Sequence, residues 1–250
     1  MEPPPPSASP GRVIDRHRLS TRLWHWLSAL AVIVLLMSGL MISNAHPRLY
    51  WGEYGANFDA PWLELPNFPG WITIPSTYDL AGARRWHLFF AWVFGLSLFL
   101  YLLWSLVNGH LRRDVVPGAR ELAPSHLWQD IKDHARLRFP TGEAAARYNI
   151  LQKLSYGGVL LVLLPLLLLT GLAMSPAMGA AWPWLNELFA GRQSARSIHF
   201  ICASLIGLFI IVHVVMVVLA GPINEMRSMI TGRYRLPDGP VEPQEPAHAD

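Results

Sequence analysis

Four long apolar runs dominate the pattern of hydrophobic and polar positions along the chain. They cover residues 23–42, 86–107, 154–175 and 198–220, so each is 20 to 23 residues long, and none contains Asp, Glu, Lys or Arg. A helix rises about 1.5 Å per residue, so about 20 residues cross the ~30 Å hydrocarbon core of a bilayer. The pattern therefore predicts an all-α, integral membrane four-helix bundle.

The segments around these runs are more polar and of unequal length. Residues 44–85 form a predicted outer loop, whose Pro and aromatic content is typical of an ordered cap with little regular structure. The predicted inner loop, residues 108–153, contains a stretch around His126–Arg138 that favours a short amphipathic helix. Residues 1–21 are expected to be a disordered N-terminus and residues 221–250 a tail, because the two ends of the chain are rich in Pro and polar residues.

The distribution of basic residues predicts the orientation. Fifteen of the twenty Lys and Arg residues lie in the N-terminal segment, the loop between the second and third runs, and the C-terminal segment. Loops rich in Lys and Arg stay in the cytoplasm, so both termini are expected there. The net charge of +3 is then a topology signal, and membrane lipid rather than nucleic acid is the expected partner. The first run exceeds the usual signal-peptide core of about 7–15 residues, which disfavours cleavage.

Composition narrows the class of protein further. Hydrophobic residues make up 52% of the 250 residues and charged residues only 15%, whereas a typical soluble domain has about 25% charged residues. This composition disfavours an ordinary water-soluble enzyme. The single cysteine, Cys202, excludes an intramolecular disulfide framework, a four-cysteine iron–sulfur site and covalent haem attachment through CxxCH.

Four of the ten histidines fall inside the apolar runs: His25, His87, His199 and His213. Ionisable residues at membrane depth are costly and usually functional. With the predicted orientation, His25 lies near the inner face, and His87 and His199 lie near the outer face. His213 follows His199 by 14 residues, which places it about 21 Å deeper and within about 40° of the same helix direction. The histidines therefore form two levels, with His25 beside His213 and His87 beside His199.

Two facing imidazoles at each level suit haem iron, which takes two axial ligands on opposite sides of a flat ring. A closed zinc site needs four ligands where each level offers two, and proton relays normally include Asp or Glu, which the runs lack. We therefore predict two haem groups between the helices. For any single histidine, a structural role or an interfacial anchor stays open. The other histidines are interpreted as solvated surface: His17, His46, His110, His126, His134 and His248.

Four arginines lie close in sequence to the membrane histidines. Arg22, Arg84, Arg85 and Arg196 lie within a few residues of His25, His87 or His199. They could pair with haem propionates or face lipid headgroups and water, and both interpretations stay open.

Several sequence motifs resemble those of a known family. His25 stands in an R-x-x-H-W context, Arg85-Trp-His87 opens the second run, and Ser197-Ile-His199 precedes His213 in the fourth. With Arg147–Lys153 and Thr170–Pro176, these residues resemble the bacterial di-haem cytochrome b family. Its members are membrane subunits of Ni/Fe-hydrogenases, formate dehydrogenases and thiosulfate reductases, or stand alone.

The resemblance covers about residues 12–235. It implies a multi-pass protein of the bacterial inner membrane with two haem b groups and a quinone site near the inner haem. His25 and His213 match the inner-haem ligands, and His87 and His199 match the outer-haem ligands. In the formate dehydrogenase branch, the Asn of a Y-N-x-x-Q-K segment lies at the quinone site.

That role carries over to Asn149, with Gln152 and Tyr156 as weaker neighbours, and ubiquinone or menaquinone is the exchangeable substrate. The alternative for Asn149 is the N-cap of the third helix, and the two interpretations stay level.

The leading hypothesis is electron transfer between the quinone pool and a periplasmic oxidoreductase partner in a respiratory chain. The chain has no nucleotide or flavin-type glycine motif, so substrate chemistry would belong to another subunit. A stand-alone quinol oxidase that passes electrons to a small acceptor is the alternative, and a haem-free transporter or scaffold is the third hypothesis. The outer loop distinguishes the first two, since it would be a docking surface in one and a lid in the other.

Overall fold

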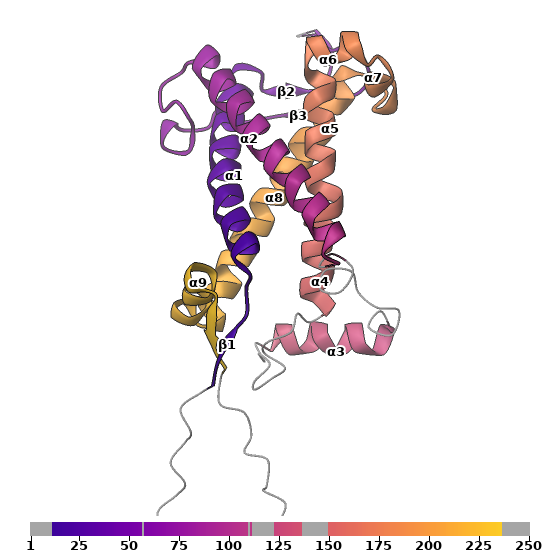
Figure 1. Ribbon diagram of the computed structural model, residues 1–250. Coiled ribbons are helices and arrows are strands. Elements are labelled where there is room, and N and C mark those ends of the chain that lie inside the picture. The colour runs from indigo at the N-terminus through magenta and orange to yellow at the C-terminus, as the bar shows by residue number, and fades with distance from the viewer. Residues whose placement is uncertain (1–11, 57, 110, 112–122, 137–149, 237–250) are drawn as a thin grey trace, which may run out of the picture. The chain divides into compact units, whose positions relative to one another are not determined.

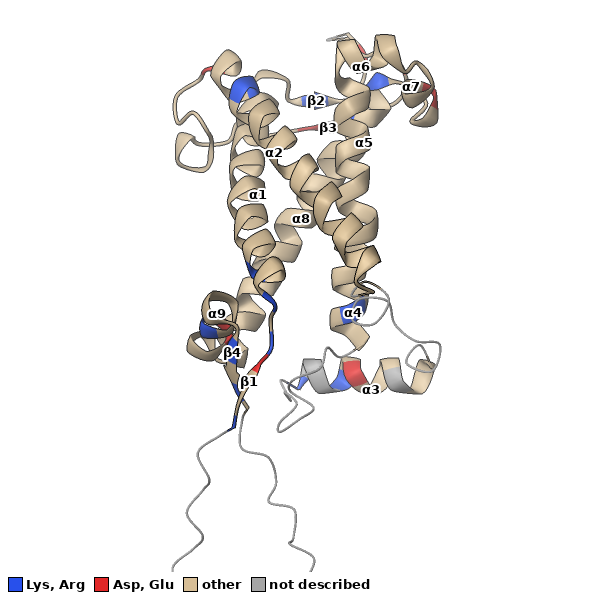
Figure 2. Cartoon of the chain, viewed as in Figure 1, with Lys and Arg blue, Asp and Glu red and all other residues tan. Residues whose placement is uncertain are grey.

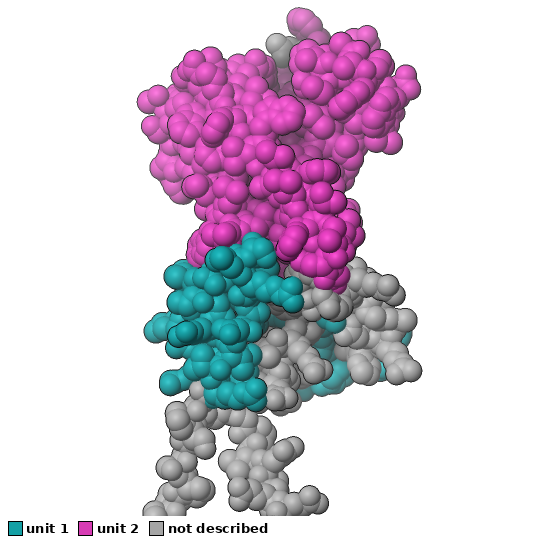
Figure 3. Space-filling model, viewed as in Figure 1, with its two compact units in different colours: residues 1–22, 117–153, 216–250 teal, residues 23–116, 154–215 magenta. Residues whose placement is uncertain are grey.

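The computed structural model describes residues 12–56, 58–109, 111, 123–136 and 150–236, most of which are helical (Figure 1). The chain divides into two compact units (Figure 3). The first unit consists of residues 1–22, 117–153 and 216–250, and the second of residues 23–116 and 154–215.

Four long apolar helices are present, one for each predicted run. They are α1 (Leu19–Ala45), α2 (Leu80–Val107), α8 (Arg192–Ala220) and a composite third helix of α4 (Ile150–Gly158), the π-helical turn η4 (Val159–Leu163) and α5 (Leu164–Met174). Each is long and apolar enough to cross a membrane. Figure 2 shows that the charged residues of these helices lie near their ends. The predicted all-α membrane protein is therefore confirmed.

The helices extend beyond the predicted apolar runs. α2 begins at Leu80, because the Asp79 carboxylate caps it by accepting a hydrogen bond from the Gly82 amide at 2.8 Å. α8 likewise begins at Arg192 rather than at residue 198. A hydropathy pattern detects only the apolar middle of such a helix, because its ends carry capping and charged residues.

The second unit buries several small residues between its helices and exposes many large apolar ones. Ala31 and Ser38 are fully buried, whereas Phe99 and Ile211 are each 63% exposed. The Trp24 and Tyr101 rings stack at 4.1 Å within this core. Outward apolar side chains with small residues at helix contacts are what a lipid environment favours.

The segment between α1 and α2 is held by hydrogen bonds more than by regular structure. Its elements are the antiparallel strands β2 (Arg48–Leu49) and β3 (Leu63–Glu64) and the 3-10 turn η1 (Gly70–Ile72). The Ser197 hydroxyl of α8 donates to the Tyr50 carbonyl at 2.6 Å and accepts from the Trp62 indole at 2.9 Å. The short helices α6 (Pro176–Ala181) and α7 (Trp184–Leu188) connect α5 to α8.

The first unit contains a small ribbon that the sequence does not predict. Strand β1 (Val13–Asp15) pairs antiparallel with β4 (Arg233–Arg235), beside helix α9 (Pro222–Thr231). The expectation that residues 1–21 are disordered is therefore wrong for β1 and for the start of α1, and residues 221–250 are not merely a tail. The partner of β1 lies at the opposite end of the chain, so local composition cannot reveal the pairing.

The segment between α2 and α4 contains one described helix, α3 (Pro124–Ala135), at the place where an amphipathic helix is predicted. The Asp130 carboxylate of α3 accepts a hydrogen bond from the Ile150 amide at the start of α4, at 3.1 Å.

Candidate haem site

The four membrane histidines form two facing pairs within the second unit. His25 of α1 faces His213 of α8, with ring centres 6.3 Å apart and planes inclined by 56°. His87 of α2 faces His199 of α8, with ring centres 6.2 Å apart and planes inclined by 59°. The structure thus brings together the two pairs that the depth of the histidines predicts.

The His87–His199 pair is held by hydroxyl groups from neighbouring helices. Ser38 Oγ of α1 lies 3.1 Å from His87 Nδ1 and donates its proton to the Val34 carbonyl at 2.6 Å. Since a serine hydroxyl carries one proton, it accepts from His87, and the Nδ1 atom carries the hydrogen. In a neutral imidazole, the lone pair is then on Nε2.

His199 is held in the same way from α5. Thr170 Oγ1 lies 3.0 Å from His199 Nδ1 and donates to the Leu166 carbonyl at 2.7 Å. Nδ1 of His199 is therefore the donor, and its Nε2 is the atom with a lone pair. Both hydroxyl residues are fully buried.

A glycine follows each of these hydroxyl residues. A Cβ atom built on Gly39 would lie 3.5 Å from the His87 ring, and one built on Gly171 would lie 3.6 Å from the His199 ring. The pairs Ser38-Gly39 and Thr170-Gly171 therefore present the same surface to the two histidines, a hydroxyl acceptor next to a bare stretch of backbone.

The His25–His213 pair has aromatic surroundings instead. The Trp26 ring meets the His25 ring edge-on at 5.1 Å, and the Phe209 ring stacks on His213 at 5.8 Å with planes inclined by 14°. Nδ1 of His25 is buried and has no hydrogen-bond partner among the described residues.

Both pairs fit a metal ion held between two imidazoles. Metal–imidazole nitrogen bonds are about 2 Å long, so two rings on opposite sides of one ion have centres roughly 6 Å apart once the nitrogen-to-centre distances are added. Among the described residues, no group of three or more His, Cys, Asp or Glu gathers as a metal site. Two-histidine sites of this kind suit haem iron better than zinc, which needs more protein ligands.

Two arginines converge at His46, directly after the C-terminal end of α1. Arg84 Nη2 lies 3.4 Å from His46 Nε2, and Arg196 donates to the His46 carbonyl. Burial, with the positive charges of Arg196 and Arg84, lowers the pKa of His46. Neither arginine takes part in an ion pair among the described residues. Because Arg84 and Arg196 each lie three residues before a paired histidine, each stands one helical turn from the His87–His199 pair on the same face.

The remaining predicted site residues lie in different surroundings. Asn149 lies outside the described residues. Tyr156 of α4 contacts the Phe209 ring edge-on at 6.3 Å, and Phe209 in turn stacks on His213. Arg22 donates to the Ile230 carbonyl at the end of α9. Arg84 and Arg196 are thus the two predicted arginines that meet near a histidine pair.

The sequence does not single out three residues of the site, which are Ser38, Thr170 and His46. Serine and threonine are common in membrane helices, so their identity alone carries no signal. A pattern was nevertheless present, because an arginine stands three residues before each of His25, His87 and His199. That recurrence marks the helical turn on which Arg84 and Arg196 meet His46.

The chain is similar to known membrane cytochromes over most of its length. A family model described as prokaryotic cytochrome b561 matches residues 16–232. A protein of Azospira oryzae named as a protein-methionine-sulfoxide reductase subunit, YedZ1, is 30% identical over 203 residues, which are 79% of this chain and 87% of that protein. Proteins of Cupriavidus necator and Azotobacter vinelandii named as Ni/Fe-hydrogenase B-type cytochrome subunits are each 25% identical. These two matches cover 86% of this chain, and 83% and 85% of the relatives.

The histidine pairs on apolar helices and these similarities define a membrane cytochrome of the b type. The chain belongs to the prokaryotic cytochrome b561 family. It is a haem b-binding electron-transfer protein of the bacterial inner membrane, with several membrane-spanning helices.

Proposed function

We propose that the chain is a di-haem cytochrome b that carries electrons between the quinone pool and a periplasmic oxidoreductase partner. The observation that carries this proposal is the presence of two facing imidazole pairs at two positions along α8. His25 and His213 bind one haem iron, and His87 and His199 bind the other. Two haems at different depths give electrons a path across the membrane.

The cluster of Arg84, Arg196 and His46 supports a haem at the His87–His199 pair. The two guanidinium groups approach one residue, and no described carboxylate forms an ion pair with either of them. Haem propionates are carboxylates that match guanidinium hydrogen-bond geometry. We therefore assign Arg84 and Arg196 to the propionates of this haem.

The aromatic contacts of the other pair support a quinone site on that side. Tyr156, Phe209 and His213 form a continuous line of ring contacts from α4 to the histidine pair. A tyrosine hydroxyl can donate a hydrogen bond to a quinone carbonyl. Tyr156 is therefore proposed to lie at the quinone site, together with Asn149 and Gln152 from the preceding residues.

Exposed aromatic side chains between α1 and α2 support a docked partner. Tyr54 is 87% exposed, Phe58 is fully exposed and Trp71 is 80% exposed. Aromatic residues are enriched at protein–protein interfaces, and the named relatives are subunits of oxidoreductases. We propose that this segment docks an oxidoreductase subunit.

A pyridine haemochrome assay on the purified chain tests the proposal. The expected result is two haem b groups per chain, both reduced by a quinol. A preparation that is folded and contains one haem or none would contradict the di-haem assignment.

Replacing Tyr54 and Trp71 by serine tests the docking role. It should slow electron transfer to the partner while leaving both haems in place, and unchanged transfer would contradict the docking role.

A further inference from the structure

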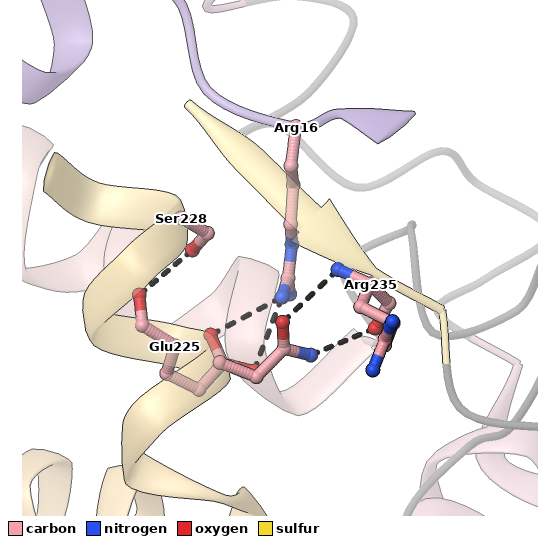
Figure 4. Close-up of polar contacts among 5 residues, drawn as sticks. Arg16, Glu225, Ser228 and Arg235 are labelled. Atoms are coloured by element: carbon pink, nitrogen blue, oxygen red, sulfur yellow. Dashed lines mark hydrogen bonds and ion pairs between the residues drawn. The ribbon is translucent and has the colours of Figure 1, made fainter. Parts of the chain in front are cut away.

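Helix α9 has its polar side chains turned inward and its apolar side chains turned outward. A surface helix in water normally does the reverse. Ser228 is fully buried, and the Glu225 carboxylate accepts two hydrogen bonds from Arg16, at 3.1 and 3.2 Å (Figure 4). The outward stripe consists of Ile223, Met226 and Ile230, which are 85%, 43% and 58% exposed.

The β1–β4 ribbon fixes this inverted orientation. The Asn224 amide donates to the Arg235 carbonyl at 2.7 Å and accepts from the Arg235 backbone amide at 3.0 Å. The Arg16 guanidinium stacks over the Tyr234 ring at 4.4 Å while it pairs with Glu225. Rotating α9 to hide its apolar stripe would break all of these contacts, so the stripe faces outward in the folded chain.

The chain places α9 directly after a membrane-spanning helix. α8 ends at Ala220, and Gly221 takes a left-handed conformation, with φ at 108°, before Pro222 begins α9. Only Gly221 therefore separates α8 from α9, and the apolar stripe begins three residues after the end of the span. An amphipathic helix at such a position lies in the membrane–water interface, where an outward apolar face is stable.

Basic residues stand beside the stripe. Val13, Arg227, Thr231 and Arg233 line an open depression of about 410 Å³. Arg227 Nε donates to the Arg233 carbonyl at 3.4 Å, whereas its Nη2 is buried and has no hydrogen-bond partner among the described residues. A buried donor without an acceptor is costly, and a phosphate group is an acceptor that matches guanidinium geometry.

We propose that α9 is an interfacial helix that binds anionic phospholipid. Ile223, Met226 and Ile230 insert among the acyl chains, and Arg227 and Arg233 contact the lipid phosphate. Arg233 faces Asp15 in the register of the ribbon, whereas Arg227 forms no ion pair among the described residues, so Arg227 is the less neutralised of these two cations. This surface requires no haem, so the proposal that it binds lipid is independent of the proposed electron-transfer role.

Spin labels test the insertion in the full chain reconstituted into phosphatidylcholine–phosphatidylglycerol nanodiscs. Labels are placed at Ile223→Cys and Ile230→Cys in a Cys202→Ala background. Ile211→Cys gives the lipid reference and Glu53→Cys the water reference. We expect both α9 labels to collide with oxygen more often than with a water-soluble nickel chelate. Water-like values at both positions would overturn the proposal, as would shielding from both reagents, which would mean that a protein covers the stripe.

The amount of lipid retained by the chain tests the proposed contact between Arg227 and the lipid phosphate. Native mass spectrometry of the full chain with added phosphatidylglycerol should show about fivefold less bound lipid for Arg227→Gln, a loss typical of one basic residue at an anionic surface. Arg227→Lys should retain most of the binding. Arg18→Gln, which removes an exposed charge from the same unit, is the matched control. Equal losses for Arg18→Gln and Arg227→Gln, or no loss for either, would overturn the assigned headgroup site.

Discussion

The two histidine pairs have nearly equal ring separations but different surroundings. The His87–His199 pair is held by buried hydroxyls on α1 and α5, with two arginines one helical turn away. The His25–His213 pair packs against Trp26 and Phe209. Axial ligation alone does not set a haem potential, because hydrogen bonds to the ligands and nearby charges tune it. Four identical side chains can therefore give two haems with different potentials.

The largest expected effect comes from removing a histidine. His87→Ala and His199→Ala should each remove the same haem, and His25→Ala and His213→Ala the other, because each iron needs both of its axial ligands. Haem content and reduced-minus-oxidised spectra measure this outcome. If His87→Ala and His25→Ala removed the same haem, the two pairs would not be separate sites.

Removing the two arginines should shift one potential strongly. Arg84→Gln with Arg196→Gln should lower the midpoint potential of the His87–His199 haem, on the order of 50–100 mV, because nearby positive charge favours the reduced state. The other haem should be unaffected. Arg85→Gln removes a neighbouring exposed charge and is the control. Spectroelectrochemical titration distinguishes the two haems, and equal shifts in both would contradict the assignment of the propionates.

The hydroxyl contacts should have a smaller effect on the same haem. Thr170→Val removes the acceptor for His199 Nδ1 at nearly constant volume, while Thr170→Ser keeps a hydroxyl. A hydrogen bond worth about 1 kcal/mol corresponds to about 40 mV for one electron. We expect the potential to rise in Thr170→Val, because the imidazole becomes a weaker electron donor, and to stay near that of the unchanged chain in Thr170→Ser. Identical potentials in all three proteins would show that the contact is only structural.

The smallest expected effect is a pH dependence of stability in the haem-free chain. The pKa of His46 is lowered in the folded chain, so the unfolded chain binds a proton more readily. The contribution of His46 to the free energy of unfolding is therefore fully present above the unfolded pKa of about 6.5, and it is lost as the pH falls below that value. Thermal unfolding of His46→Gln should lack this component. In the haem-loaded protein, propionates beside His46 should reduce this loss of stability at low pH. The same pH dependence with and without haem would argue against propionates at this position.

The arrangement of α1 and α2 shows what a sequence can predict. The apolar residues of each helix are contiguous, so hydropathy locates both spans, and the positions of His25 and His87 within them follow directly. The ends were less accurate, because Asp79 caps α2 before its apolar run begins. The contacts of Ser38 with His87 and of Thr170 with His199 were not predictable, since they join residues 49 and 29 positions apart on different helices.

The sequence by itself determined the four spans, the predicted orientation and the pairing of histidines by depth. These features depend on local hydrophobicity, loop charge and the constant rise of a helix. Only the tertiary structure decided which hydroxyls hold His87 and His199, where Arg84 and Arg196 meet, and which side of α9 faces outward. Each of these depends on the rotation of one element against another, and packing sets that rotation from residues distant in the chain.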